Sequence, residues 1–217
     1  MTGIISSTST MAIYDDVKNR IISLELPPGS TLTEIGLSKH YSISRTPIRD
    51  VMRFLTHQHF LVHSHGSHRV AEMSIDDYKN IYQMREIYES LSIREAVLLG
   101  SRKDVPALEE NINKQKKLAK EPYDLLEYLR LNREFHLRFA LMSNNPYLIN
   151  GLDNVYDLFY RYNIYSDFDH PYGFAISEHI RIYEYFIQGD LYRAVSTMSD
   201  HLANVYALIL YRLAKKL

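Results

Sequence analysis

The hydrophobic pattern of this chain changes near residue 74, and that change limits the folds open to it. Before this point, short stretches of helical spacing alternate with turns. After it, apolar residues recur at helical spacing over long segments, which break at Glu121-Pro122, Asn144-Asn145-Pro146 and Gly189-Asp190. Breaks so far apart are typical of an antiparallel bundle with short connections. The sequence therefore predicts a mostly α chain whose second part is all-helical.

The chain has 217 residues, enough for two modest domains. We place a disordered tail at 1–10, a first domain over 11–73 and a helical domain over 76–217. The absence of cysteine excludes disulfides and thiolate metal sites, and it favours an intracellular protein. Because neither a signal peptide nor a long apolar run is present, we expect a cytoplasmic protein with no membrane partner.

Residues 11–73 predict three short helices followed by a hairpin. The first two helices are expected over 11–24 and 33–40, and the third begins after Ser44. Two short segments, the apolar 60–62 and 68–70, then flank a turn, as in a small hairpin. Three helices followed by a hairpin is the order of a winged helix-turn-helix.

The third helix carries arginines on a face that its core residues leave free. Its apolar residues follow helical spacing at Ile48, Val51, Met52 and Leu55. Arg45, Arg49 and Arg53 recur every fourth residue and so line one stripe. In a helix-turn-helix such a stripe meets base edges, where arginine can bind guanine O6 and N7. A solvated arginine face with local partners is the alternative interpretation.

The start of the same helix offers groups that suit phosphate oxygens. Ser44 is expected to cap the helix, and Ser44 and Thr46 supply hydroxyls beside the first backbone N–H groups. The formal net charge of −1 gives no global reason to expect nucleic-acid binding. The prediction of DNA binding therefore rests on where the charges lie.

The segment from Leu32 to Leu55 resembles the signature of the GntR family of winged helix-turn-helix regulators. The stretch Ser44-Arg45-Thr46-Pro47-Ile48-Arg49 is the most specific part of this resemblance. It implies a dimer on a palindromic operator, with Arg45, Thr46 and Arg49 on DNA and the hairpin tip near His65 and Gly66 in the minor groove. The chain departs from the pattern at His59, which replaces a glycine before the first hairpin strand, and at Ile35, where some members carry arginine.

Five histidines lie within twelve residues around the hairpin, at His57, His59, His63, His65 and His68. A metal-binding tract is one interpretation. The other is a polar wing that gains positive charge as the pH falls through about 6.5. The second interpretation predicts that operator affinity rises between about pH 8 and about pH 6.

The helical domain carries a second set of chemically active residues. Asn132 and His136 are four apart on one predicted helix, so both side chains lie on the same face. His179 and His201 lie on two later helices. Three neutral imidazoles and an oxygen donor can hold a divalent ion with positions left open. Hydrogen-bonded histidines without a metal are the alternative.

Several short stretches of this domain are similar to the FCD ligand-binding domain of FadR-like GntR regulators. They are 132–136, 143–145, 178–179, 189–190 and 198–202. The resemblance implies a divalent metal (Zn, Ni or Mn) on one aspartate and three histidines, with a small carboxylate effector completing the coordination. Here Asn132 stands at the aspartate position, so metal affinity is expected to fall, and a metal-free site remains an alternative. The lost negative charge favours an anionic effector.

Arg85 lies four residues before Glu89 on the first helix of the helical domain. A guanidinium that faces a cavity can clamp a carboxylate at two points. An i, i+4 surface ion pair is the other interpretation.

The leading hypothesis is a dimeric DNA-binding transcriptional regulator, most simply a repressor, whose helical domain senses a small organic acid. The alternative is a metal-dependent hydrolase that uses the three histidines, with Glu178 or Glu134 as the base. The sequence has no HExxH spacing, no glycine-rich phosphate loop and no G-x-S-x-G elbow, so we predict that the protein is not an enzyme. A helical module that binds only protein is a third class.

Overall fold

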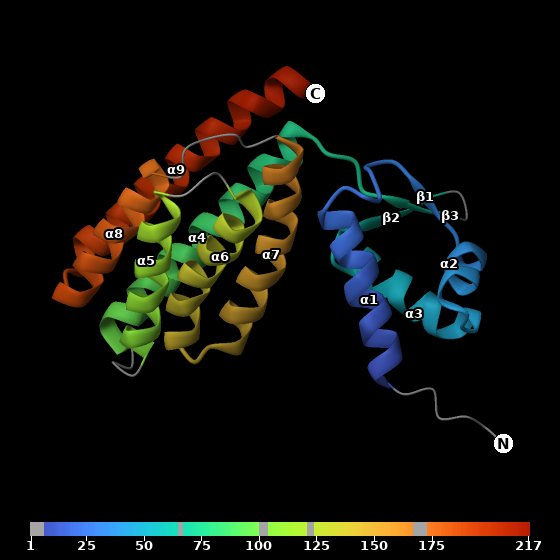
Figure 1. Cartoon of the computed structure of the whole chain (residues 1–217), viewed down its shortest axis with the longest axis horizontal. Helices are drawn as coiled ribbons and strands as arrows, with labels where there is room; N and C mark the ends of the chain where they lie inside the picture. The colour runs from blue at the N-terminus through green and yellow to red at the C-terminus, as the bar shows by residue number, and fades with distance from the viewer. Residues whose placement is uncertain (1–6, 65–66, 100–103, 121–123, 167–172) are drawn as a thin grey trace. The chain divides into compact units, whose positions relative to one another are not determined.

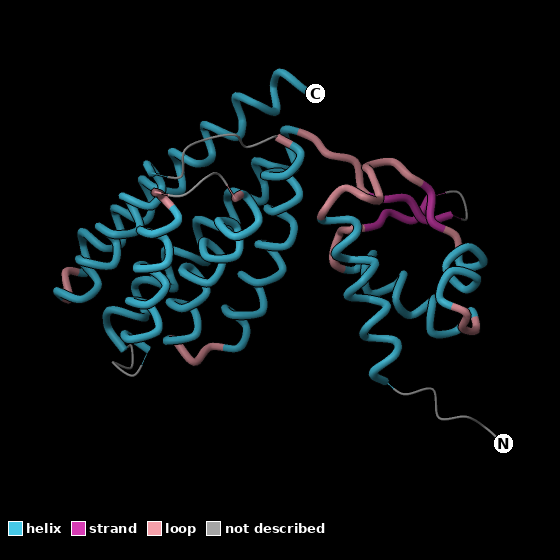
Figure 2. The backbone as a smooth tube through the Cα atoms, viewed as in Figure 1, coloured by secondary structure: helices cyan, strands magenta, loops and turns pink. Residues whose placement is uncertain are grey.

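The computed structural model describes residues 7–64, 67–99, 104–120, 124–166 and 173–217. The chain divides into two compact units, Met1–Ser74 and Ile75–Leu217, which are described separately below. The predicted fold class is confirmed, since helices dominate the chain and a helix-turn-helix with a hairpin precedes a helical bundle (Figures 1 and 2).

The first unit combines three helices with a small sheet. The helices are α1 (Ser7–Ile22), α2 (Glu34–Tyr41) and α3 (Arg45–His57), and the strands are β1 (Thr31–Leu32), β2 (Leu61–Ser64) and β3 (Ser67–Val70). The sheet is antiparallel with the order β1-β3-β2, so the hairpin strand β3 lies in the middle. The two-residue strand β1 was not among the predicted elements, because a segment so short has no periodicity to detect.

Helix α1 begins earlier than the sequence analysis expected. Residues 7–10 are helical, although they were assigned to a disordered tail, and the first six residues lie outside the described part of the chain. The helix packs on α3 through Ile13, Val17 and Ile21, which are all buried. The helix therefore extends upstream into a polar segment that carries no apolar spacing.

The turn between α2 and α3 is held by local hydrogen bonds. Thr33 caps α2 by accepting a hydrogen bond from the backbone N–H of Gly36, and Ser42 ends it in the left-handed region at φ 54°. Ser44 occupies the cap position of α3, but its side chain makes no capping hydrogen bond, so the predicted cap is wrong. Its hydroxyl is exposed instead.

The second unit is a bundle of helices that lie alongside one another (Figure 1). They are α4 (Ile75–Leu99), α5 (Val105–Leu118), α6 (Leu125–Met142), α7 (Pro146–Tyr165), α8 (Gly173–Gln188) and α9 (Leu191–Lys216). Helix α4 packs against α6, α7 and α9, while α5 packs against α6 and α8. The core includes Ile93, Phe135, Phe139, Ile182 and Leu202, each at most 1% exposed. No helix among the described residues combines the length and the apolar character that crossing a membrane requires.

Candidate functional site

Helix α3 presents arginines from one face and buries the other. Ile48, Val51, Met52 and Leu55 are fully buried, which fixes the rotation of the helix about its axis. The side chains of Arg45 and Arg49 are each 57% exposed, and that of Arg53 is 76% exposed. Thr46 is exposed as well. The predicted DNA-contacting residues that the structure describes therefore lie on one accessible surface.

Arg45 and Arg49 share one carboxylate from the preceding helix. Arg45 Nη2 lies 3.0 Å from Oε2 of Glu34, and Arg49 Nε lies 2.8 Å from its Oε1. Hydrogen bonds from Arg49 and Arg45 lower the pKa of Glu34 to about 2, so this carboxylate stays ionised. Arg53 has only a loose contact, 3.9 Å from Asp50. Sequence analysis missed Glu34, although it lies in the segment that carries the family resemblance.

The hairpin places two histidines across from each other. His63 and His68 are paired residues of β2 and β3, and their ring centroids lie 4.8 Å apart. Burial and the neighbouring His63 lower the pKa of His68. His65 and Gly66, predicted at the hairpin tip, lie outside the described residues. His57, His63 and His68 line one hollow beside Arg49 and Arg53.

His59 adopts a positive φ of 65° just before β2. A glycine adopts this left-handed conformation without a steric penalty, whereas a residue with a Cβ is rarely found there. This geometry explains why the related pattern has glycine at the position, and histidine is among the residues that tolerate it better than β-branched ones.

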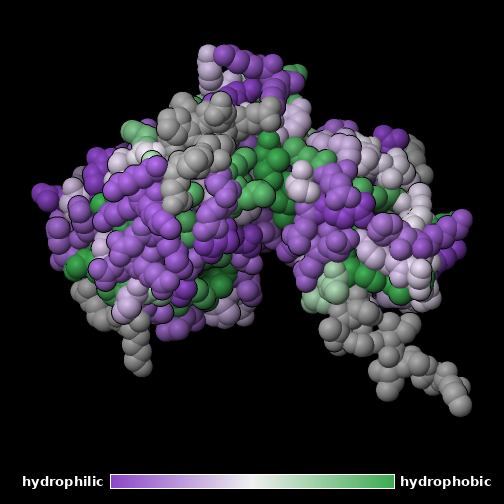
Figure 3. Space-filling view, viewed as in Figure 1, coloured by the Kyte–Doolittle hydropathy of each residue, from purple (hydrophilic) through white to green (hydrophobic). Residues whose placement is uncertain are grey.

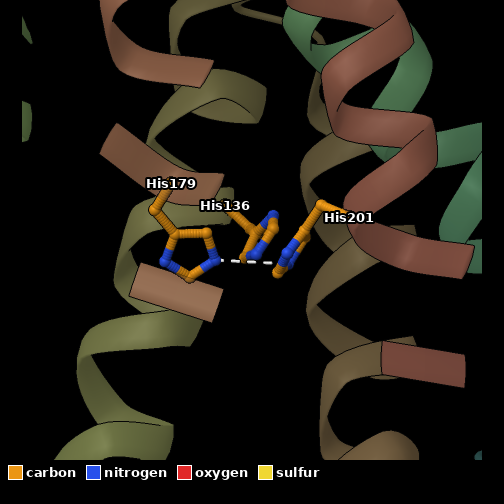
Figure 4. A group of neighbouring side chains, drawn as sticks. All are labelled: His136, His179 and His201. Carbon is orange, nitrogen blue, oxygen red and sulfur yellow. Dashed lines mark hydrogen bonds between the residues drawn. The ribbon is translucent and has the colours of Figure 1, made fainter. Parts of the chain in front are cut away.

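The structure brings together three of the four predicted metal ligands. His136 on α6, His179 on α8 and His201 on α9 are each at most 1% exposed, and one ring nitrogen of each lies within 4.8 Å of the others. Figure 4 shows the three rings turned toward a common point. Among the described residues this is the one such group of His, Cys, Asp or Glu, so nothing in that part of the chain supports a metal tract on the hairpin.

The spacing of two of the nitrogens already suits a shared ion. His179 Nε2 and His201 Nε2 lie 3.2 Å apart. Two imidazole nitrogens bound to one zinc ion at about 2.0–2.1 Å lie roughly 3.0 to 3.4 Å from each other. Asn132 lies one turn before His136 on α6 and is 5% exposed, so it is buried on the face that carries the cluster.

Carboxylates behind the rings determine where two of the histidines carry their protons. His201 Nδ1 donates to Oε2 of Glu178 at 2.8 Å, and His136 Nδ1 contacts Oε2 of Glu89. Because a carboxylate can only accept, both rings hold their proton on Nδ1 and leave a lone pair on Nε2. Among the described residues Nε2 of His136 has no hydrogen-bond partner, whereas its Nδ1 has the close contact with Glu89, although that contact does not have hydrogen-bond geometry. The buried Nε2 lone pair of His136, which has no partner, lies near the Nε2 lone pair of His201. This arrangement fits a bound cation.

Burial keeps two histidines of the cluster, His136 and His179, in the neutral form that metal ligation requires. Desolvation lowers the pKa of His136 to about 4, although Glu89 opposes the shift, and it lowers the pKa of His179 well below its usual value. Burial raises the pKa of Glu89, but Arg85 and His136 outweigh that effect and hold it at about 2. At neutral pH His136 and His179 are therefore neutral, and they lie near the ionised carboxylate of Glu89.

Arg85 is buried inside the bundle and not on its surface. It is 3% exposed, donates from Nε to Glu89 at 2.7 Å and from Nη2 to the hydroxyl of Tyr156 at 3.1 Å. Its guanidinium carbon also lies 3.8 Å from the ring centroid of Phe159. The surface-pair interpretation is therefore wrong, because both partners are buried. Two of the donors expected to clamp an external carboxylate are already bound.

The two carboxylates considered as catalytic bases have other partners. Both oxygens of Glu178 accept hydrogen bonds, one from His201 and one from Asn204 at 2.7 Å. Glu134 pairs with Arg130 and Arg138. All four oxygens of these two carboxylates therefore already accept a hydrogen bond within the chain.

Comparison with known proteins identifies the chain. Residues 10–68 match the gntR family of bacterial regulatory proteins, and residues 80–204 match the FCD domain. The chain belongs to the GntR family. It is therefore a transcriptional regulator with an FCD domain, as the sequence resemblance predicted, and GntR-family regulators bind operator DNA.

Individual relatives of this GntR-family regulator agree with that assignment. It is 28% identical over 177 residues to the uncharacterized HTH-type transcriptional regulator YdhC of Bacillus subtilis strain 168, a match covering 80% of this chain and 79% of YdhC. It is 22% identical over 196 residues to the HTH-type transcriptional repressor RspR of Escherichia coli K12, covering 89% and 85% of the two chains. These relatives are regulators, so they give no support to the hydrolase alternative.

Solved structures show the same fold. E. coli McbR/YncC superimposes with a TM-score of 0.79 at 19% identity, covering 94% of this chain and 98% of that one. A GntR-type transcriptional regulator from Rhodococcus sp. RHA1 has a TM-score of 0.72 at 20% identity, with coverage of 94% and 98%. The GntR-family architecture is thus shared along nearly the whole chain.

Proposed function

We propose that this regulator is a homodimeric repressor whose FCD bundle senses a small carboxylate through a bound divalent metal. The observation that carries this proposal is the convergence of His136, His179 and His201, with the Nδ1 atoms of His136 and His201 each facing a carboxylate. Acceptors behind the imidazoles are typical of protein metal sites, and this likeness supports the proposal.

The three imidazoles would bind the ion through Nε2, and the amide oxygen of Asn132 would add a neutral donor. The ion would supply a positive centre to which an effector carboxylate can bind. The charges around it favour such an effector, because Glu89 and Glu178 contribute two negative charges and Arg85 one positive charge. A divalent ion then leaves one net positive charge, which a monocarboxylate can neutralise. We propose that Arg85 contributes to effector binding through this charge balance.

In the first unit, Arg45 and Arg49 would contact base edges, while Ser44, Thr46 and Arg53 would contact phosphates. Their exposure on α3 supports these roles. The proposed minor-groove contact of His65 and Gly66 rests on the family resemblance alone.

Helix α4 supports the proposed dimer. Met84, Ile87, Leu91 and Leu98 are 38–59% exposed. At 100° per residue they fall on one stripe, on the side of α4 away from buried Arg85 and Glu89. We call this the α4 stripe. Figure 3 shows a molecular face that is mostly hydrophilic with hydrophobic patches, and several large apolar side chains exposed on one side of a helix are typical of an interaction surface. A second copy on a palindromic operator is the occupant we propose.

One relative supports the sign of regulation that we propose. RspR is a transcriptional repressor that aligns along most of this chain. We therefore propose that the free protein represses and that the effector releases it from DNA, by shifting the balance between two conformations of the dimer.

Metal analysis tests the sensing half of this proposal. Protein purified without chelator is analysed for bound metal as wild type, His179→Ala and Asn132→Asp. We expect metal in the wild type, a loss in His179→Ala and roughly tenfold tighter binding in Asn132→Asp, because a carboxylate replaces the neutral amide. Substoichiometric metal in all three proteins, even after incubation with zinc, nickel or manganese, would overturn it.

A thermal-shift screen tests the effector. Small carboxylates are added with and without divalent metal, and a ligand that binds the folded state raises the melting temperature. We expect shifts that require both metal and carboxylate. Operator release is then followed by fluorescence anisotropy on a palindromic duplex chosen from a random library. If no duplex is selected above background, the DNA-binding proposal fails independently of the metal result.

A further inference from the structure

A chain of buried hydrogen bonds connects the backbone of α6 to the ring of His179. Asn111 Nδ2 donates to the carbonyl oxygen of Leu131 at 3.1 Å, and Gln115 Nε2 donates to Oδ1 of Asn111 at 2.6 Å. Gln115 Oε1 then lies 2.7 Å from Nδ1 of His179. Asn111 is 1% and Gln115 0% exposed, so water does not compete for these groups. We call Asn111 and Gln115 the amide relay.

The directions of these bonds are fixed from one end. A backbone carbonyl can only accept, so Asn111 must turn its NH2 group toward Leu131. Its oxygen then faces Gln115 and requires a donor, which turns the NH2 group of Gln115 toward Asn111. The oxygen of Gln115 is left facing His179, and an oxygen acceptor requires a proton on Nδ1.

The competing arrangement is also visible in the geometry. Glu178 holds the proton of His201 on Nδ1, so Nε2 of His201 is an acceptor, 3.2 Å from Nε2 of His179. A proton on Nε2 of His179 would form a hydrogen bond to His201. That bond would occupy two of the three nitrogens that converge in the cluster, so the tautomer of His179 decides whether the cluster offers three lone pairs or one.

We propose that Asn111 and Gln115 are positioning residues that hold the proton of His179 on Nδ1 and keep its Nε2 available as a ligand. Carboxylates determine the tautomers of His136 and His201. The tautomer of His179 is determined by a neutral amide, whose orientation the carbonyl of Leu131 imposes through Asn111. The functional role of this tautomer rests on the proposed metal site. The tautomer itself is a property of the metal-free protein.

The tautomer can be measured directly. The full-length protein is labelled with 15N-histidine, freed of metal with chelator, and examined by long-range 1H–15N correlation, with His179 assigned by comparison with His179→Gln. We expect the Nδ1–H form of His179 in the wild type. In Gln115→Leu the acceptor is gone, so we expect the Nε2–H form, and we expect zinc affinity to fall about 10- to 100-fold.

Matched variants separate positioning from a purely structural effect. In Asn111→Asp burial favours the neutral carboxyl, whose O–H can donate to the carbonyl of Leu131 while its other oxygen still accepts from Gln115, so we expect the wild-type tautomer and near wild-type zinc affinity. In Asn111→Leu that oxygen is lost, and we expect the Nε2–H form to appear. Leu108→Ala, at a fully buried apolar position of the same helix, should lower the melting temperature while leaving the tautomer unchanged.

Two results would overturn the inference. One is an Nε2–H form of His179 in the wild type, and the other is an unchanged Nδ1–H form in both Gln115→Leu and Asn111→Leu. Failure of the proposed metal site gives a different outcome, in which the tautomer follows the relay as expected but zinc binds to none of the proteins.

Discussion

Arg85 and Glu89 form an ion pair with a separation of 2.7 Å in the interior of the bundle, where they are 3% and 1% exposed. Tyr156 donates a hydrogen bond to the same oxygen of Glu89 at 3.2 Å, and His136 contacts the other oxygen. The pair is therefore a fixed part of the histidine cluster. Burying two charges is costly unless each is satisfied by the other, so the loss of one partner leaves the second in an unfavourable position.

Replacing Glu89 should destabilise the protein strongly. Glu89→Gln is expected to lower the free energy of unfolding by about 3 to 5 kcal/mol, because the guanidinium of Arg85 stays buried without its counterion. The double variant Arg85→Met/Glu89→Leu should recover much of that loss. Urea unfolding measures both. The control is Glu110→Gln, which removes an exposed partner of Lys114. If Glu89→Gln lowers the free energy of unfolding no more than this control does, Glu89 is not needed as the counterion of buried Arg85.

Arg49 should discriminate between bases. Arg49→Ala is expected to weaken binding to the selected operator roughly 5- to 150-fold. The ratio of the affinity for the operator to the affinity for a random duplex should fall as well. Arg53→Ala should weaken both duplexes alike and reduce the slope of affinity against salt by about one. Fluorescence anisotropy at several salt concentrations gives these values. Equal losses on both duplexes for Arg49→Ala would make it a phosphate contact.

Operator binding should strengthen as the pH falls. Protonated histidines on the hairpin add positive charge near phosphates, so affinity is gained on the acid side of each pKa. Burial and His63 lower the pKa of His68, while Glu34 opposes this shift. The gain in operator affinity that comes from protonating His68 should therefore occur below about pH 6.5. Anisotropy at constant ionic strength measures the profile, and His68→Gln should flatten its acid end. A profile that is flat from about pH 8 to about pH 5.5 contradicts this prediction.

The α4 stripe should hold the dimer together. Ile87 is 59% exposed, and Ile87→Lys places a charge in the middle of the stripe, so we expect a monomer at concentrations where the wild type is a dimer. Sedimentation velocity measures the change. Leu126→Lys is the control, since Leu126 is 71% exposed on α6 and outside the stripe. Equal mass for the two variants would exclude this stripe as the interface.

Local pattern predicted much of the fold. The core face of α3 and the long helices of the bundle follow from apolar spacing, because a helix that packs on one side must repeat its apolar residues every three or four positions. The start of α1 and the short strand β1 were missed, since frayed or two-residue elements carry little periodicity.

The site was harder to predict, because its parts come from distant segments. Asn132 and His136 were linked by helical spacing, but only the packing of α6, α8 and α9 places His179 and His201 beside them. The acceptors behind the rings come from α4, α5 and α8, and no local spacing connects them to the histidines. One signal was present, since Asn111 and Gln115 are polar residues four apart, and they share the buried side of α5 with Leu108 and Ile112.

Glu34 gives the surface of α3 a property that counting charges does not reveal. If Arg45 and Arg49 contact DNA as proposed, their guanidinium groups return to a carboxylate of their own chain when the helix leaves the duplex. In the free protein Glu34 thus holds both arginine side chains side by side. They therefore lose less conformational entropy when they bind DNA. Binding to a base edge then replaces the contacts with Glu34 by contacts with the base. A base that accepts fewer hydrogen bonds does not compensate for the contacts with Glu34 that are lost.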